Sequence, residues 1–164
     1  MGAVMKRLVP ADLQLVKPEN ENRINRDFAL DFDEVVPMFF ANVLVVEDDS
    51  TTSSYIKAIL KRSIERPLRV RSFASAEKAA EYIYSLGRFQ LPGPDVAIID
   101  YHLSGEADGL WLCKLVENRF PETQTVLVSS TPVSLLQFRM KELNISPIFL
   151  KKPLMAESLR KFVV

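Results

Sequence analysis

Short apolar runs alternate with amphipathic stretches from Asn42 to the end of the chain. Five of these runs have the length of strands, and they span residues 43–46, 68–73, 96–99, 126–128 and 148–150. Between them, apolar residues recur at helical spacing and predict four amphipathic helices, around residues 56–64, 79–86, 112–116 and 136–143. This alternation predicts repeated β/α units around a mostly parallel sheet.

The charge pattern within the runs predicts the place of each strand in the sheet. Residues 43–46, 96–99 and 126–128 are continuously apolar, as strands covered on both faces must be, whereas residues 68–71 alternate apolar with charged side chains. The second strand is therefore predicted to be an edge. We expect an α/β fold, namely a flavodoxin-like, doubly wound, five-stranded parallel sheet with the order 2-1-3-4-5 and an N-terminal extension.

Several residues that favour helix ends agree with these predicted helices. Ser75 is placed to cap the second helix, and Gly87 is placed to end it. Thr131 followed by Pro132 suits the cap and the first turn of the fourth helix. The pattern thus predicts where two of the helices begin.

Residues 1–41 read differently from the rest of the chain. They carry seven acids against five bases, with prolines at positions 10, 18 and 37, and their second half is too apolar to stay exposed. We expect residues 1–41 to form an N-terminal extension, helical or dimerising, followed by one domain over residues 42–164. The chain ends inside a predicted fifth helix with Met155 and Leu159 on its apolar face, and we expect this helix to be truncated.

Composition narrows the class of protein. The chain has 164 residues, and its 21 Lys and Arg residues equal its 21 Asp and Glu residues, so it offers no general basic field for nucleic acid or a membrane surface. Its single cysteine, Cys113, cannot form an internal disulfide, and no apolar run is long enough to cross a bilayer. We therefore expect a cytoplasmic protein.

Acidic residues follow two strands that should be neighbours in the sheet. Glu47, Asp48 and Asp49 come after the first strand, and Asp100 comes directly after the third. Carboxylates that are brought together share protons or hold a hard cation, and all-oxygen ligands favour Mg²⁺. The alternative interpretation of the first group is a solvated acidic turn beside a helix cap.

A hydroxyl and an ammonium group are predicted at the same edge of the sheet. The fourth strand ends in Ser129 and Ser130, and the fifth ends in Lys151, Lys152 and Pro153. A carboxylate beside Mg²⁺, with a lysine and a hydroxyl close by, is suited to phosphoryl transfer, because positioning and charge neutralisation supply most of that catalysis. Asp100 would then be the covalent acceptor.

The segment from Asn42 to Val164, about three quarters of the chain, resembles the receiver domain of bacterial two-component response regulators. The segments that carry the resemblance are VVEDD after the first strand, IIDYHLSGEADG after the third, VLVSS in the fourth and FLKKP at the fifth. The resemblance implies a Mg²⁺ site formed by the side chains of Glu47, Asp48 and Asp100 and the backbone carbonyl of His102. Asp100 matches the residue that is phosphorylated in that family.

The same resemblance implies roles for residues of the last two strands. Ser129 and Lys152 match the hydroxyl residue and the lysine that assist phosphorylation of Asp100, and Phe149 falls where the family carries a switch aromatic that moves together with Ser129. Phosphorylation would then alter the surface formed by the fourth helix, the fifth strand and the fifth helix. The resemblance thus implies a signalling domain, not an enzyme, which catalyses only its own phosphorylation and dephosphorylation.

The partner implied by the resemblance is a sensor histidine kinase or a phosphotransfer protein. The apolar half of the N-terminal extension predicts a homodimer, and the truncated fifth helix is consistent with a C-terminal effector domain missing from this chain. No direct binding of nucleic acid or membrane by this part is expected. The alternative is a pseudo-receiver that acts as a phosphorylation-independent docking or dimerisation module. A phosphohydrolase of the haloacid-dehalogenase type would need a second aspartate two residues after Asp100, where His102 stands.

The sequence departs from the usual receiver pattern at four places. Glu47 replaces the more usual aspartate, Ser129 stands where threonine is more usual, and Ser104 stands where many receivers have proline. The stretch from Asp100 to Gly109 is one residue longer than the commonest form. None of these departures removes a group that phosphoryl transfer requires.

Four residues with chemically reactive or charged side chains are expected to have ordinary structural roles. Lys151 is expected at the surface, since only one of two adjacent strand residues can face the crevice. Asp49 is expected to be solvated, and the imidazole of His102 is expected to be idle while its carbonyl binds the metal. Cys113 is expected to be a small apolar filler on the third helix.

Overall fold

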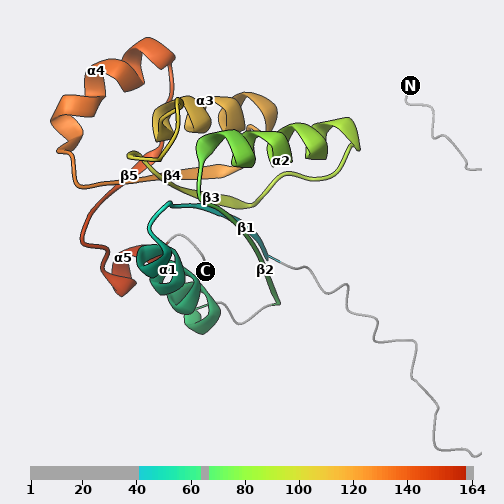
Figure 1. The fold of residues 1–164 in the computed structure, drawn as a ribbon, viewed down its shortest axis with the longest axis horizontal. Coiled ribbons are helices and arrows are strands. Elements are labelled where there is room, and N and C mark those ends of the chain that lie inside the picture. The colour runs from blue at the N-terminus through green and yellow to red at the C-terminus, as the bar shows by residue number, and fades with distance from the viewer. Residues whose placement is uncertain (1–40, 64–66, 162–164) are drawn as a thin grey trace, which may run out of the picture. The chain divides into compact units, whose positions relative to one another are not determined.

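The computed structural model describes residues 41–63 and 67–161. The expected N-terminal extension, except for Ala41, and the last residues of the expected fifth helix lie outside the described residues. Within the described part, strands and helices alternate strictly along the chain (Figure 1). The elements are β1 (Ala41–Val46), α1 (Ser50–Ser63), β2 (Leu68–Phe73), α2 (Ala76–Arg88), β3 (Val96–Asp100), α3 (Gly109–Arg119), β4 (Gln124–Ser129), α4 (Val133–Leu143), β5 (Ile148–Lys151) and α5 (Ala156–Arg160).

The strands pair in parallel in the order β2-β1-β3-β4-β5, which confirms the predicted flavodoxin-like topology. The prediction that the second strand is an edge is also confirmed. In the register of the sheet, Val46 of β1 lies beside Ile99 of β3, and Asp100 lies beside Val128 of β4. The residues that follow β1, β3 and β4 therefore lie close together, at the carboxyl ends of these strands.

Helices cover both faces of this sheet (Figure 1). The core against α2 and α3 contains Leu44 and Val46 of β1, and the core against α1 and α5 contains Val43 and Val45. Because successive side chains of a strand point to opposite faces, a strand between two helix layers must be apolar at every position. This explains the continuous apolar runs in β1, β3 and β4.

The helix α4 buries little of its surface. Leu136 is its one buried residue, whereas Leu135 and Phe138 are 68% and 70% exposed. Leu136 packs in the same core as α2 and α3, so α4 lies on that side of the sheet. Two large apolar side chains of α4 are therefore exposed to solvent.

The ends of α2 match the ends predicted from the sequence only in part. Ser75 caps the helix as predicted, because its side chain accepts a hydrogen bond from the N–H of Lys78. The prediction that Gly87 ends the helix is wrong, since α2 continues to Arg88. The chain instead turns at Gln90, which has a φ of +54°.

The prediction that Thr131 caps α4 is also wrong. The cap residue of α4 is Pro132, which makes no side-chain cap. The hydroxyl of Thr131 instead forms a hydrogen bond of 2.8 Å with Nε2 of His102, in the loop after β3. A tertiary contact that joins two loops has therefore replaced the local cap.

Asp49 caps α1, although the sequence predicted only a solvated side chain there. The residue is exposed, but its carboxylate Oδ1 accepts the N–H of Thr52 at 2.7 Å. This hydrogen bond lowers the pKa of Asp49. The acid next to Asp48 thus belongs to the helix start, and its carboxylate is directed away from the strand edge.

The apolar faces of the last helices are short. α5 buries only Leu159, and Met155, which was assigned to its apolar face from the sequence, is 63% exposed.

Cys113 is fully buried on α3, as expected of a small apolar filler. Among the helices of the described part, none is long and apolar enough to cross a membrane.

Candidate functional site

Three carboxylates converge where β1 and β3 end. Side-chain oxygens of Glu47, Asp48 and Asp100 all lie within 4.8 Å of one another. Glu47 and Asp100 are 3% and 4% exposed, whereas Asp48 is exposed to solvent. The cluster is thus set into the sheet edge on one side and open to solvent on the other.

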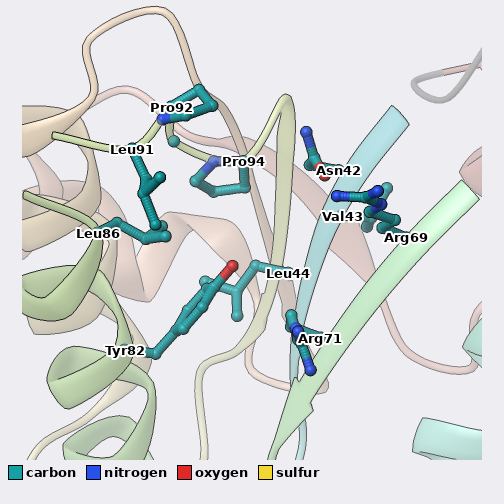
Figure 2. A pocket seen from close by; sticks show the side chains of 11 residues that line it. Asn42, Val43, Leu44, Arg69, Arg71, Tyr82, Leu86, Leu91, Pro92 and Pro94 are labelled. Atoms are coloured by element: carbon teal, nitrogen blue, oxygen red, sulfur yellow. The ribbon is translucent and has the colours of Figure 1, made fainter. Parts of the chain in front are cut away.

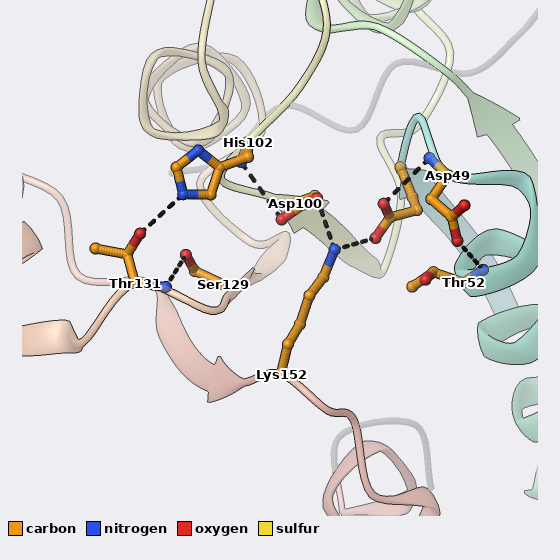
Figure 3. A network of polar contacts seen from close by, with 8 residues as sticks. Asp49, Thr52, Asp100, His102, Ser129, Thr131 and Lys152 are labelled. Carbon is orange, nitrogen blue, oxygen red and sulfur yellow. Dashed lines mark hydrogen bonds and ion pairs between the residues drawn. The ribbon is translucent and has the colours of Figure 1, made fainter.

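Lys152 lies between the two buried carboxylates, and Figure 3 shows its side chain reaching toward Asp100. Its Nζ is 2.8 Å from Oε2 of Glu47 and 2.7 Å from Oδ2 of Asp100. The backbone N–H of Lys152 donates to the carbonyl of Ser129 at 2.8 Å, which fixes this residue at the end of β5. The neighbouring Lys151 is exposed, so the structure brings only Lys152 to the acids.

The charges of this cluster do not balance. Burial raises the pKa of Glu47, and the nearby Asp100 carboxylate raises it further, although the hydrogen bond from Lys152 opposes both. Burial lowers the pKa of Lys152, but the hydrogen bonds to Asp100 and Glu47 outweigh burial and raise it. One ammonium therefore faces three acids, and the site retains a demand for positive charge.

The donors present fit a hard divalent cation. The three clustered residues offer only carboxylate oxygens, which suit Mg²⁺ and not zinc or copper, and exposed Asp48 leaves room for bound water. The backbone N–H of His102 donates to Oδ1 of Asp100 at 3.4 Å, so His102 lies directly beside the cluster. The metal role of the His102 carbonyl stays a prediction from the resemblance.

Ser129 lies on the strand next to Asp100 and is fully buried. Its Oγ accepts the backbone N–H of Thr131 at 3.0 Å (Figure 3). Its hydroxyl proton is therefore left for another acceptor. Phe149 is half-buried on β5 and packs against the core on the side of α2 and α3, and its switch role stays a prediction.

The imidazole of His102 has a contact that the sequence did not predict. Its Nε2 meets Oγ1 of Thr131 at 2.8 Å, and its ring packs edge-on against Tyr101. The ring thereby joins the loop after β3 to the loop after β4, beside Asp100 (Figure 3). The only sequence signal for this pair was that each residue stands two positions beyond a predicted site residue.

A second concavity in the structure carries no acids. This pocket of about 260 Å³ opens near the amino ends of β1 and β3, between two arginines of β2 and apolar side chains of α2 and the following loop (Figure 2). Its lining includes Asn42, Arg69, Arg71, Tyr82, Leu86 and Leu91. It lies away from the carboxyl ends of the strands, so it has no part in the carboxylate site.

The comparisons with known proteins agree with this geometry. The family model described as response regulator receiver domain matches residues 43–164. No match is found among the curated proteins. Solved structures with the same fold include the signal receiver domain of a modulated diguanylate cyclase from Desulfovibrio desulfuricans G20, with a TM-score of 0.60 and 23% identity over 76% of this chain and 91% of that one.

Two further structures are similar at lower identity. A CheY-like receiver domain protein from Methanospirillum hungatei JF-1 has a TM-score of 0.60 and 16% identity, over 75% of this chain and 90% of that one. A response regulator protein from Burkholderia pseudomallei, solved with a phosphorylated aspartic acid, a calcium ion and citrate, has a TM-score of 0.60 and 18% identity, over 75% of this chain and 66% of that one. At these identities the structures show a shared fold.

Proposed function

Because this chain belongs to the response regulator receiver domain family, we propose that it accepts a phosphoryl group onto Asp100 from a histidine kinase or a phosphotransfer protein. The observation that carries this proposal is the convergence of Glu47, Asp48, Asp100 and Lys152 at one sheet edge. These four residues supply a nucleophile, a site for a divalent cation and a fixed ammonium group. The phosphorylated aspartic acid and calcium ion of the Burkholderia protein give a precedent within the same fold.

The covalent step uses one carboxylate oxygen of Asp100. That oxygen forms a bond to phosphorus while the bond between phosphorus and the imidazole nitrogen of the donor breaks, and the electron pair leaves on that nitrogen. Asp100 attacks as a carboxylate, and its Oδ2 lies 2.7 Å from the ammonium of Lys152. When bound by Glu47, Asp48, Asp100 and the His102 carbonyl, Mg²⁺ supplies positive charge that offsets the phosphoryl oxygens.

Lys152 and Ser129 stabilise the charge that the phosphoryl group brings. The Lys152 ammonium now binds Oδ2 of Asp100, and it can pair with a phosphoryl oxygen once that carboxylate has become an acyl phosphate. The Ser129 hydroxyl lies on the neighbouring strand and can donate to another phosphoryl oxygen. Movement of Ser129 toward the phosphoryl group, with Phe149 following, would change the surface of α4, β5 and α5.

Replacement of Asp100 tests the acceptor directly. We expect Asp100→Asn to reduce labelling by acetyl phosphate and Mg²⁺ by more than about 100-fold, because the amide cannot act as the nucleophile. Asp49→Asn is the matched control, since Asp49 is a nearby acid whose carboxylate caps α1 instead. Labelling of the Asp100→Asn protein at the wild-type rate would place the acceptor elsewhere.

The docking module is the competing function, and beryllofluoride separates it from the proposed one. We expect beryllofluoride with Mg²⁺ to bind at Asp100 and change the fluorescence of Trp111, which is 42% exposed at the start of α3. Light scattering on the same samples shows whether the bound form assembles. If wild-type protein shows neither labelling nor a response to beryllofluoride, a docking or dimerisation module is favoured.

A further inference from the structure

The loop between β3 and α3, residues 101–108, is held at both of its ends. At its start, the N–H of Tyr101 donates to Val128 of β4 at 2.8 Å. At its end, Asp108 caps α3 by accepting the N–H of Trp111 at 3.0 Å, and it forms an ion pair with Arg139 of α4. This loop carries His102 and follows Asp100 directly. Its conformation therefore determines where the oxygens of these two residues lie in the carboxylate cluster.

The middle of this loop is held by a side chain from α2. Oε1 of Glu77 accepts the backbone N–H of Glu106 at 3.0 Å and that of Ala107 at 3.1 Å. The hydrogen bond from Ala107 lowers the pKa of Glu77, because it stabilises the ionised carboxylate. One acid thus satisfies two adjacent N–H groups of a loop that lies 29 and 30 residues away in sequence.

One further residue of the loop is adapted to this contact, and another binds the segment before α2. Gly105 has a φ of +126°, and a Cβ at this position would lie 2.7 Å from both carboxylate oxygens of Glu77. Only glycine therefore allows the backbone to approach the acid so closely. Ser104 adds a weaker contact, since its hydroxyl donates to the carbonyl of Ala74 at 3.4 Å.

We propose that Glu77 is a positioning residue for phosphorylation: its carboxylate fixes the loop 101–108 so that His102 and Asp100 present their oxygens to the cation and the phosphoryl group. This inference rests on the proposed function. Glu77 touches neither of those residues and acts only through the backbone of Glu106 and Ala107. The loop lacks a proline that would fix its course, and Glu77 supplies the constraint from outside.

Removal of the carboxylate is expected to loosen the loop without unfolding the domain. In Glu77→Ala, the two N–H groups bond to water, and the loop samples other shapes. We expect the Mg²⁺ concentration that gives half-maximal labelling by acetyl phosphate to rise about tenfold, as for other residues that orient metal ligands indirectly. At saturating Mg²⁺ the labelling rate should recover to within about threefold of wild type, because bound cation itself restores the loop.

Two variants isolate the acceptor role of Glu77. Glu77→Gln retains an oxygen that accepts both N–H groups, so it should restore the half-maximal Mg²⁺ concentration to within about threefold of wild type. Glu81→Ala is the control, because it removes an acid of the same charge one turn later on α2. Glu81 lines a pocket that includes no residue of the loop 101–108, so this variant should behave as wild type. Urea unfolding without Mg²⁺ is measured for every variant to identify a general loss of stability.

The outcomes separate this inference from the proposed function. If wild-type protein is not labelled, the proposed function fails. If Glu77→Ala is labelled with the wild-type Mg²⁺ dependence, or if Glu77→Gln loses as much as Glu77→Ala, the positioning role of Glu77 is overturned. Amide hydrogen exchange at Glu106 and Ala107 reports the loop independently of phosphorylation, and exchange no faster in Glu77→Ala than in wild type would also overturn it.

Discussion

The charge of Glu47 is opposed by its surroundings. Burial and the Asp100 carboxylate raise the pKa of Glu47 above its ordinary value of 4.5 in spite of Lys152. Between pH 4.5 and the raised pKa, the folded state binds more protons than the unfolded state, so the unfolding free energy falls as the pH rises. Glu47 therefore destabilises the fold most above this range and least below it. A cation at the cluster would remove that cost at neutral pH.

Glu47→Gln is therefore expected to stabilise the Mg²⁺-free domain at pH 7. The amide still accepts a hydrogen bond from Lys152, but it removes one of the clustered charges. Urea titrations should show a higher midpoint for the variant at pH 7 and a smaller difference from wild type near pH 4.5. The same variant should bind Mg²⁺ more weakly. A midpoint at pH 7 below that of wild type would contradict this account of the cluster.

Gly109 is required by the backbone that surrounds Asp100. A Cβ at this position would overlap the carbonyl oxygen of Asp100. The atoms that this Cβ would meet belong to the backbone of Asp100 and Tyr101, which cannot easily move aside. We therefore expect Gly109→Ala to cost more than about 2 kcal/mol of unfolding free energy and to displace Asp100. Gly87→Ala is the control: its Cβ would meet only Nη1 of Arg119 at 3.5 Å, and alanine is about 1 kcal/mol better than glycine within a helix. Equal effects of the two changes would be inconsistent with this close approach.

At this scale, the site residues at the ends of strands could be predicted from the sequence, whereas the residues that hold loops in place could not. Glu47 and Asp100 follow apolar runs directly, and Lys152 follows one after a single residue, so sheet topology alone brings the three together. Glu77 and Thr131 act through the paths of long loops, and no spacing in the sequence defines those paths. Hydrogen bonds between distant loops depend on tertiary packing, which outweighs local signals such as a helix cap.

At the scale of elements, α4 has one buried side chain, Leu136, while Met140 and Leu143 are partly buried against the same core. Leu136→Ala should cost about 2 to 4 kcal/mol, because it leaves a cavity in the core shared with α2 and α3. Leu135→Ala, one position away and 68% exposed, should change the unfolding free energy by less than about 0.5 kcal/mol. Thermal or urea unfolding of the two variants measures the difference. Similar losses in both would mean that α4 packs on another face.

Strands were predicted more closely than helices, for a physical reason. β2 was predicted with its observed limits, since charged and apolar side chains alternate along it. α1 begins at Ser50, well before its first apolar repeat, because the polar residues of its first turn carry no periodic signal. An element is predictable where its apolar and polar positions form a regular pattern, and the first turn of α1 has no such pattern.

On the scale of the whole molecule, cation binding should stabilise the fold. A cation that binds only the folded state adds about 2.7 kcal/mol of unfolding free energy at 100 times its dissociation constant. We expect Mg²⁺ to raise the urea midpoint at constant ionic strength and a chelator to reverse the effect. Asp48→Asn should reduce the gain, because Asp48 belongs to the cluster and is exposed. An equal gain from Mg²⁺ in Asp48→Asn and wild type would place the cation elsewhere.

An open parallel sheet has two outer strands whose free backbone groups invite pairing with other chains. Here β2 carries Arg69 and Arg71, and β5 ends in the exposed Lys151. Cationic side chains along such borders discourage a neighbouring sheet from docking edge to edge. The alternating charges that identified β2 as an outer strand would therefore also oppose the addition of a further strand beside β2.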